Sequence, residues 1–376
     1  MITKLLRYMM IIVFLISTNS ILFAAGTSET SVSADISEAA GTSAPITVID
    51  SFGREVEIPA GIKRISCIYA FSAHVVTMLD RGEDIVSVVY GSKRDRLLNE
   101  INPYIRDAAV PSDDGVINIE ELLQVDSDII FLKGDTAMMP AEIDKLERFN
   151  LPYVVVDFNT IEEQMYAIEL IGRVIGREEK ALAFNNYFHR QIDKVESRII
   201  DLPASEGVRI YHSVNEAGRT DAPGTLPAEW TQLAGAENVS VGEPLRFHDN
   251  KYFASIEQIY LWDADVIIAN QEGVDEYIMT NEKWAGLKAV QNGRVYQIPI
   301  GISRWGHPGG METPLAMIWT AKLLYPGRFE DVNIEDEARH FYDSFFNHTV
   351  SDQMLAQIIS GRNMRLPKGE IRELNN

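Results

Sequence analysis

The sequence predicts an α/β protein of two Rossmann-like lobes with mostly parallel sheets, joined by a single long α-helix. One αβ unit occurs twice, at residues 118–131 and 255–268: a capping residue, Ile-Glu, a short helical pattern, and Asp-x-Asp before an apolar run. Between the copies, residues 178–200 form a long amphipathic helical pattern that no strand interrupts. The expected lobes are residues 45–176 and 204–360, with a linker helix at 177–203 and a polar tail at 361–376.

The start of the chain has the pattern of an export signal. Lys4 and Arg7 precede an apolar stretch, and Ala24-Ala25-Gly26 offers a cleavage site. We expect residues 1–26 to be a cleavable signal peptide, with an uncleaved membrane anchor as the alternative. No cysteine lies near the cleavage site, so a lipid anchor through Cys is not expected. Residues 27–44 are rich in Ser, Thr and Ala and predict a flexible leader to a periplasmic or otherwise extracytoplasmic protein.

Composition excludes some partners. The 376 residues include 55 acidic and 34 basic ones, giving a net charge of −21. Nucleic acid is therefore not an expected partner, because phosphate binding requires a basic face. Cys67 is the single cysteine and cannot form an internal disulfide. Its apolar surroundings predict a small core residue in a strand.

The elements of each lobe follow in order. Residues 46–58 form two alternating runs around Asp50–Gly53, the pattern of a β-hairpin. Later strand and helix patterns alternate, which favours parallel sheets covered on both faces. In the first lobe the expected strands are 65–69, 85–89, 129–132 and 153–156, and in the second 208–212, 266–269 and 294–298. Helices are expected near 314–324, 335–346 and 351–359.

The repeated unit places one glutamate at the start of a helix in each lobe. Asn118 and Ser255 can accept hydrogen bonds from free helical N–H groups, and Glu121 and Gln258 can complete a capping box. Glu120 and Glu257 are then left without a capping role. One such carboxylate would only complement the helix dipole, but two matched copies suggest a paired, outward-facing role. Glu312 is a third acid in a first helical turn, and its role stays open.

Candidate ligand-binding residues follow the strands, since ligands of open α/β sheets collect beyond the carboxyl ends of the strands. Aromatic and cationic side chains there suit a flat or anionic ligand. Ordinary loop packing is the alternative for each, and His74 could be a histidine at the core edge. Residues 304–307 stand out because they have no obvious packing role. The expected cleft residues are Tyr69, Phe71, His74, Tyr90, Lys93, Arg94, Lys133, Tyr211, His212, Arg219, Arg304, Trp305 and His307.

Several stretches together resemble a known family. They are residues 50–59 (DSFGREVEIP), 63–65 (KRI), both repeats, 233–239 (LAGAENV), 284–290 with 293–296 (GRVY), and 319–326 (WTAKLLYP). In this order they resemble the periplasmic substrate-binding proteins of ABC importers that carry ferric siderophores, haem and cobalamin. The resemblance implies a ligand held between two lobes, a stiff connecting helix, and permease docking through Glu120 and Glu257. Many members carry Glu where His74 stands.

The expected function is a non-enzymatic, monomeric receptor. It would capture an iron complex (a siderophore, haem or related metal chelate, or cobalamin) and deliver it to the permease subunits of an ABC importer. It would need no cofactor, and whether a side chain coordinates the metal is left open. No nucleotide-binding, phosphate-loop or hydrolase motif supports an enzyme. The alternatives are an extracytoplasmic enzyme and a direct binder of a transition-metal ion, which needs at least two of His74, His212 and His307 to converge.

Overall fold

The computed structural model describes residues 44–367. The first lobe contains a parallel sheet in the order β4-β3-β7-β8, as expected from strands that alternate with helices. Its strands are β3 (Ile65–Cys67), β4 (Ile85–Val88), β7 (Ile129–Lys133) and β8 (Tyr153–Val156). Its helices are α1 (Ala70–Met78), α2 (Tyr90–Arg94), α3 (Arg96–Ile101), α4 (Ile119–Gln124), α5 (Gly134–Ala137), α6 (Pro140–Arg148) and α7 (Ile161–Val174), with 3-10 turns η1 (Gly82–Asp84) and η2 (Pro103–Arg106) and a minor ladder of β5 (Ser112–Asp113) and β6 (Val116–Ile117).

The predicted hairpin is confirmed as β1 (Ile46–Ile49) and β2 (Glu55–Ile58). Asp50 holds its turn, because Oδ1 accepts from the N–H groups of Phe52 and Arg54, both at 3.0 Å. The same carboxylate accepts from the N–H of Val155 at 3.1 Å, which attaches the hairpin to β8. Cys67 is fully buried in β3, as expected of a core residue.

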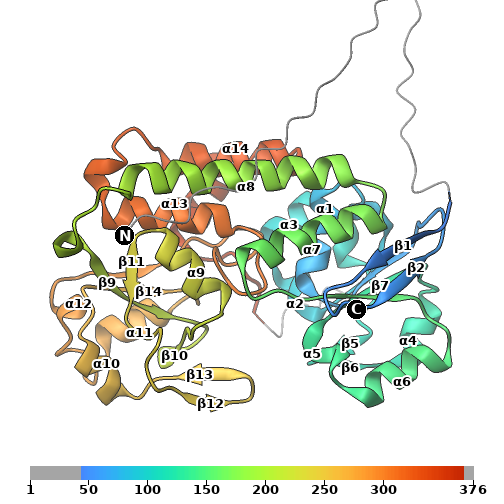
Figure 1. Cartoon of the computed structure of the whole chain (residues 1–376), viewed down its shortest axis with the longest axis horizontal. Helices are drawn as coiled ribbons and strands as arrows, with labels where there is room; N and C mark the ends of the chain where they lie inside the picture. Colours follow the sequence, from blue (N-terminus) through green and yellow to red (C-terminus); the bar gives the residue numbers. More distant parts are fainter. Residues whose placement is uncertain (1–43, 368–376) are drawn as a thin grey trace, which may run out of the picture. The chain divides into compact units, whose positions relative to one another are not determined.

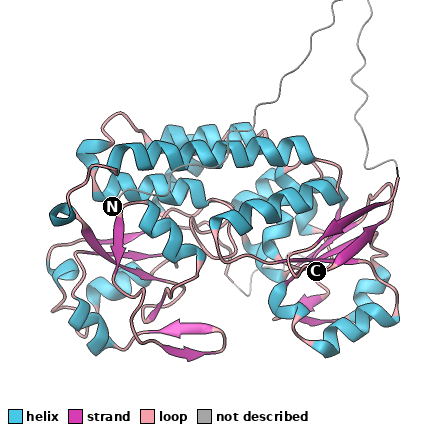
Figure 2. Ribbon diagram, in the orientation of Figure 1, coloured by secondary structure: helices cyan, strands magenta, loops and turns pink. Residues whose placement is uncertain are grey.

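The second lobe has the same architecture as the first, with a parallel sheet in the order β11-β9-β14-β15. Beside it lies an antiparallel ladder in the order β10-β13-β12 (Figure 1). We did not predict this ladder. The strands are β9 (Val208–Ser213), β10 (Arg219–Thr220), β11 (Ala236–Asn238), β12 (Arg246–His248), β13 (Lys251–Phe253), β14 (Val266–Ala269) and β15 (Val295–Gln297). The helices are α9 (Leu226–Leu233), α10 (Ile256–Trp262), α11 (Val274–Thr280), α12 (Lys288–Gln291), α13 (Thr313–Leu324), α14 (Ile334–Phe346) and α15 (Asp352–Ser360), with η3 (Ala204–Glu206) and η4 (Pro326–Arg328). Helices flank the strands in both lobes (Figure 2).

The two copies of the repeated unit are α4–β7 and α10–β14. In the second copy the capping box is complete: Ser255 Oγ accepts from the Gln258 N–H and Gln258 Oε1 from the Ser255 N–H. In the first copy Asn118 accepts from the Glu121 N–H, but the Glu121 carboxylate accepts from the Val110 N–H at 3.1 Å. The first box is therefore half formed, since Glu121 fixes an incoming loop.

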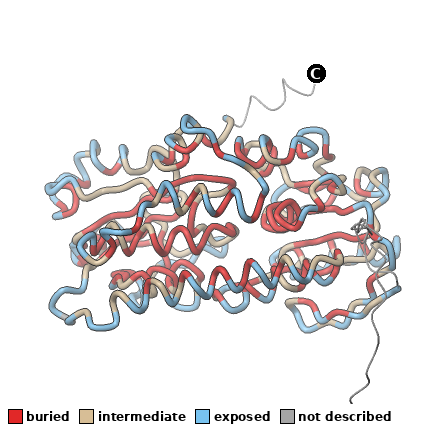
Figure 3. The backbone as a smooth tube through the Cα atoms, turned by 90° about the horizontal axis from the view of Figure 1, so that it is seen from above, coloured by how far each residue is buried: buried red, intermediate tan, exposed pale blue. Residues whose placement is uncertain are grey.

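Helix α8 (Glu178–Ile199) joins the lobes and runs along both of them (Figure 1). Phe184 is the centre of its buried face, with ring centroids 5.0 Å from Phe345 and 6.0 Å from Phe341 of α14. The largest buried cluster continues through both lobes around these rings, and buried residues line the inward faces of the helices (Figure 3). The lobes therefore share one core as well as one connecting helix.

The end of the chain differs from the expected polar tail. Residues 361–367 continue from α15, contact the second lobe at 362–363 and pair with the first lobe at 364–366, with Met364 fully buried. Two apolar residues, Met364 and Leu366, in a short polar segment gave too little periodicity to reveal this. The rest of the tail, the signal peptide expected at 1–26 and nearly all of the leader expected at 27–44 lie outside the described residues. Within residues 44–367, no helix has the length and apolar character needed to cross a bilayer.

Substituting Phe184→Ala tests the shared core. We expect a loss of about 3–5 kcal/mol in the free energy of unfolding, because a buried aromatic side chain leaves a cavity. Denaturant unfolding followed by circular dichroism measures it. The control is Leu182→Ala on the same helix, whose side chain is 48% exposed and should change stability by less than about 1 kcal/mol. If the two substitutions lower the free energy of unfolding equally, the buried face of α8 is not the centre of the shared core.

Candidate ligand-binding cleft

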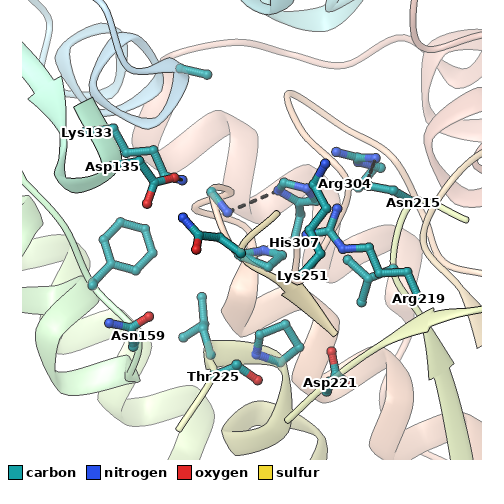
Figure 4. A pocket seen from close by; sticks show the side chains of 18 of the residues that line it. Lys133, Asp135, Asn159, Asn215, Arg219, Asp221, Thr225, Lys251, Arg304 and His307 are labelled. Carbon is teal, nitrogen blue, oxygen red and sulfur yellow. Dashed lines mark hydrogen bonds and ion pairs between the residues drawn. The ribbon is translucent and has the colours of Figure 1, made fainter. Parts of the chain in front are cut away.

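A cavity of 640 Å³ opens at the carboxyl ends of the strands of both lobes. Lys133 at the end of β7 and Asp135 of the first lobe lie across it from Arg304, His307 and Arg219 of the second (Figure 4). This is the position at which open α/β sheets bind ligands. The expected cleft residues that line it are Tyr69, His74, Lys133, Arg219, Arg304 and His307.

In the loop at residues 301–310, two of the four residues 304–307 pack in the core and the other two line the cleft. Trp305 is fully buried, and its Nε1 donates to Tyr342 Oη at 3.3 Å. Gly306 has a φ of +67°, and a Cβ there would come within 2.6 Å of the Trp230 ring. We expected no packing role for these two residues, and that expectation was wrong for both. Arg304 and His307 are the pair that lines the cavity.

Arg304 is a half-buried cation that has no ion pair with a carboxylate among residues 44–367. Its Nη1 donates to two amide oxygens, Asn215 Oδ1 and Gln271 Oε1 (2.7 Å to the latter). Burial and then the positive charge of Arg365 lower the pKa of Arg304 to about 9, against an opposing effect of Asp95. A desolvated guanidinium among like charges is stabilised by any anion that enters the cavity.

His307 presents a hydrogen-bond donor to this cavity. Its Nδ1 accepts from the Gly309 N–H at 3.1 Å, so in the neutral ring the proton is on Nε2. Burial, followed by the positive charges of Arg304 and Arg365, holds the pKa of His307 well below its ordinary value. The ring is therefore neutral near pH 7 and donates through Nε2–H.

Glu312 holds the loop that carries Arg304 and His307. Its carboxylate accepts from the N–H groups of Ile302 (2.8 Å) and Ser303 (2.7 Å) and from the Ser303 hydroxyl (2.7 Å). The Tyr342 hydroxyl donates to it at 2.6 Å. Burial raises the pKa of Glu312 to about 7 in spite of these donors. The third acid noted in the sequence is thus a structural anchor of the cleft.

His74 lines the opposite side of the cavity and is only 2% exposed. Neither of its ring nitrogens has a hydrogen-bond partner among the described residues. Its Nε2 lies 4.0 Å from Asp95 Oδ2, and Asp95 pairs with Arg365 at 2.7 Å between Oδ1 and Nε. Burial and then Arg365 lower the pKa of His74 to about 3, so this ring is also neutral.

Most carboxylates at the cavity already have partners. Asp135 pairs with Lys133, Asp95 pairs with Arg365, and Asp221 contacts His212 Nδ1 at 2.8 Å. Arg219 and Arg304 have no ion pair with a carboxylate among the described residues. Four carboxylates (Asp95, Asp135, Asp157 and Asp221) and five cations (Lys133, Arg219, Lys251, Arg304 and Arg365) line the cavity, so its formal charge is 5 − 4 = +1 with neutral histidines, although the whole chain carries −21.

The other expected cleft residues do not line the cavity. Phe71 packs against Phe158 with ring centroids 4.5 Å apart, and the Tyr211 hydroxyl donates to the carbonyl of Ala217. Tyr211 lies within β9, where alternation turns its side chain inward, and Phe71 lies in α1 with its side chain on the buried face of that helix. The full set is Phe71, Tyr90, Lys93, Arg94, Tyr211, His212 and Trp305.

Three of these side chains make structural contacts away from the cleft: His212, Lys93 and Arg94. His212 is buried in β9 and contacts Asp221 below the cavity. Lys93 Nζ donates to the carbonyl of Arg106 at 2.9 Å, and Arg94 Nε to that of Leu366 at 2.7 Å. The described residues contain no group of three or more His, Cys, Asp or Glu side chains placed to hold a metal ion.

Sequence reasoning missed several residues that line the cavity. Asn215 follows β9, Lys251 lies on the unpredicted β12–β13 hairpin, and Asp95 lies between two short helices. The Asp249-Asn250 turn, with φ of 48° and 53°, was the available signal for the hairpin. Nothing local in the sequence indicated Arg365, because its position depends on the fold of the chain end.

Glu120 and Glu257 are both exposed in the first turns of α4 and α10. The pKa of Glu257 is lowered by hydrogen bonding to its own backbone N–H and to the Ser255 hydroxyl. Each helix precedes a strand whose carboxyl end borders the cavity, so each N-terminus lies toward that edge of its sheet.

Comparison with known proteins places the chain among binding proteins. The molybdate-binding protein MolA of Haemophilus influenzae is 26% identical over 326 residues, which cover 80% of this chain and 90% of MolA. The solved structure of MolA bound to molybdate has a TM-score of 0.73 at 23% identity, covering 81% of this chain and 99% of that chain. The structure of Helicobacter pylori CeuE with Ni(II) bound has a TM-score of 0.67 at 19% identity, covering 84% and 99%.

These two structures share the fold, with its two lobes and parallel sheets, and so confirm the predicted fold class. A family model described as periplasmic binding protein matches residues 65–300, more than half of the chain. The match confirms the expected class of protein without specifying an iron complex. The chain belongs to the periplasmic binding protein family.

Proposed function

We propose that this protein is an extracytoplasmic receptor that captures a metal oxyanion of the molybdate type and delivers it to an ABC permease. The observation that carries the proposal is Arg304, a desolvated guanidinium in the cleft that amide oxygens hold and no carboxylate neutralises. Binding an anion there offsets the unfavourable burial of charge.

The donor set suits an oxygen-rich anion better than a bare cation. Arg304 and Arg219 supply positive charge, and His307 supplies an N–H from Nε2. Guanidinium groups form charge-assisted hydrogen bonds with tetrahedral oxyanions. A metal cation would instead need several converging ligands, and the described residues hold no group of three or more His, Cys, Asp or Glu side chains placed for one.

The similarity to MolA supports this ligand class, because MolA binds molybdate and covers most of this chain. MolA is the cognate periplasmic binding protein of an ABC transporter in Haemophilus influenzae, which supports delivery to a permease here. The export pattern at the N-terminus agrees with an extracytoplasmic receptor.

An anionic iron chelate is the second candidate. The cavity volume of 640 Å³ lies in the range of sites for drug-sized ligands. Tyr69, Phe158 and Tyr252 line it and offer flat surfaces to a chelating ligand. Such a complex would use the same cations and would bring its metal already coordinated.

Titration of the purified protein with a ligand panel tests the proposal. We expect molybdate to bind with 1:1 stoichiometry in isothermal titration calorimetry, and Arg304→Gln to weaken it at least tenfold, since charge-assisted hydrogen bonds contribute about 1.5–3 kcal/mol. Arg190→Gln, an exposed position on α8, is the matched control and should bind as wild type. Binding of a ferric siderophore complex but not of molybdate would select the second candidate. No binding of either would refute the receptor proposal.

The affinity for molybdate should depend on pH. Burial raises the pKa of Asp95 to about 6, even though the positive charges of Arg365, Arg304 and Arg94 lower it. Protonation removes a negative charge beside the cleft, so anion affinity should increase as the pH falls from about 8 to about 5.5. His74, with a pKa of about 3, stays neutral over this interval. Calorimetry across the interval should show the increase in the wild type and a smaller increase in Asp95→Asn, in which only other groups such as Glu312 (pKa about 7) still titrate. A decrease toward low pH would contradict the assignment.

The paired glutamates should act in transport and not in capture. Glu120→Ala combined with Glu257→Ala should abolish import of the ligand into cells while leaving its Kd unchanged, because both side chains are exposed and neither lines the cavity. Uptake of labelled ligand and calorimetry measure the two effects. The control pair is Glu55→Ala with Glu196→Ala, also exposed. Weakened ligand binding in the Glu120/Glu257 variant would overturn the docking role.

A further inference from the structure

The last described residues of the chain connect the two lobes a second time. After α15 ends, Arg362 pairs with Asp275 of α11 at 2.6 Å, and the Asn363 N–H donates to Glu272 Oε1 at 2.9 Å. These contacts fix residues 362–363 to the second lobe, beside the strand β14 that precedes α11.

The next three residues are fixed to the first lobe. The Arg96 N–H donates to the carbonyl of Met364 at 3.0 Å, and the Leu366 N–H donates to the carbonyl of Arg94 at 2.8 Å. Asp95 and Arg365 face each other in this antiparallel bridge. Residues 362–366 therefore form an interlobe strap, anchored by side chains on one lobe and by backbone pairing on the other.

The strap carries Arg365 into the wall of the cavity. Its Nε lies 2.7 Å from Asp95 Oδ1, and its Nη2 donates to the carbonyl of Gly91 at 3.3 Å. The Nη2 hydrogen bond and the backbone pairing of the strap hold the guanidinium in the wall, while Nε approaches Asp95 as an ion pair without hydrogen-bond geometry. Buried His74, whose ring nitrogens have no partner among the described residues, lies on the other side of the same Asp95 carboxylate.

We propose that Arg365 and His74 form a second anion-binding subsite, on the first-lobe side of the cleft, which faces the Arg304 and His307 subsite of the second lobe. This inference rests on the proposed function, because it assumes an anionic ligand. The Asp95 carboxylate partly neutralises Arg365, and the Gly91 carbonyl and the backbone pairing of the strap hold Arg365 in place when Asp95 is protonated. The ligand is then contacted by groups fixed to both lobes.

The electrostatics of the cavity agree with this arrangement. After burial, the charge of Arg365 is the next cause that lowers the pKa of both His74 and Arg304. Arg365 therefore acts on both sides of the cavity, and one anion can relieve the repulsion on both. The unpartnered His74 gains the hydrogen bond that a buried imidazole requires.

Matched substitutions within the strap test the proposal, with sodium molybdate as the probe and calorimetry as the readout. Arg365→Gln removes the cavity cation, whereas Arg362→Gln removes an equal charge three residues away that does not line the cavity. We expect Arg365→Gln to raise the Kd at least tenfold, Arg365→Lys to raise it less, and Arg362→Gln to change it less than about twofold. His74→Phe should also raise the Kd. Thermal unfolding confirms that each variant is folded.

The outcomes separate this inference from the proposed function. If the wild type binds molybdate and Arg365→Gln binds it equally well, the second subsite is refuted while the proposed function stands. Equal losses in Arg365→Gln and Arg362→Gln would also refute it, because the strap would then matter only as a structural link. Failure of the wild type to bind molybdate would refute the oxyanion proposal, and the subsite with it.

Discussion

The packing of α8 against α14 is the interaction on which the rest of the structure depends. Phe184, Tyr187 and Phe188 are buried on one face of α8, and the Phe341 and Phe345 rings of α14 cover them. Through this contact the largest buried cluster continues from one lobe into the other, and the cleft lies between them. The loops at the carboxyl ends of the two sheets then stand at fixed positions, which pre-organises the groups that line the cavity. The strap at residues 362–366 adds a second link between the lobes.

Pre-organisation explains how an acidic protein can hold several cations together. Arg304 is held by Asn215 and Gln271, and its loop is fixed by buried Glu312, so its charge cannot move away from its neighbours. Burial first, and then the repulsion between these groups, lowers the pKa of Arg304 to about 9 and holds that of His307 well below its ordinary value. Cations that cannot relax favour an anion more strongly than mobile surface lysines do, because no reorganisation is needed when the anion arrives. The folding energy of the shared core thus maintains a site that is electrostatically unfavourable when empty.

The fold could be predicted from sequence because its signals are local. The repeated αβ unit, the hairpin around Asp50 and the long helix each depend on spacing within one segment. The site was predicted only in part. Strand ends identified Tyr69, Lys133 and Arg304, but side-chain direction at a strand end depends on tertiary packing, so Phe71 and Tyr211 are buried instead. Trp305 and Gly306 are unusual residues with packing roles, which composition alone cannot separate from ligand contacts. Arg365 is about 270 residues from its partner Asp95 in the sequence, and only the folded chain brings them together.

The central claim is that fixed cations in the interlobe cleft bind a metal oxyanion. Crystals of the protein grown with molybdate would test it most directly, because anomalous scattering at the molybdenum edge locates the metal independently of the rest of the electron density. The account predicts one strong anomalous peak in the cavity, with oxyanion oxygens within hydrogen-bonding distance of Arg304 and of Nε2 of His307. A peak outside the cleft, or none at a molybdate concentration that saturates binding in solution, would contradict it.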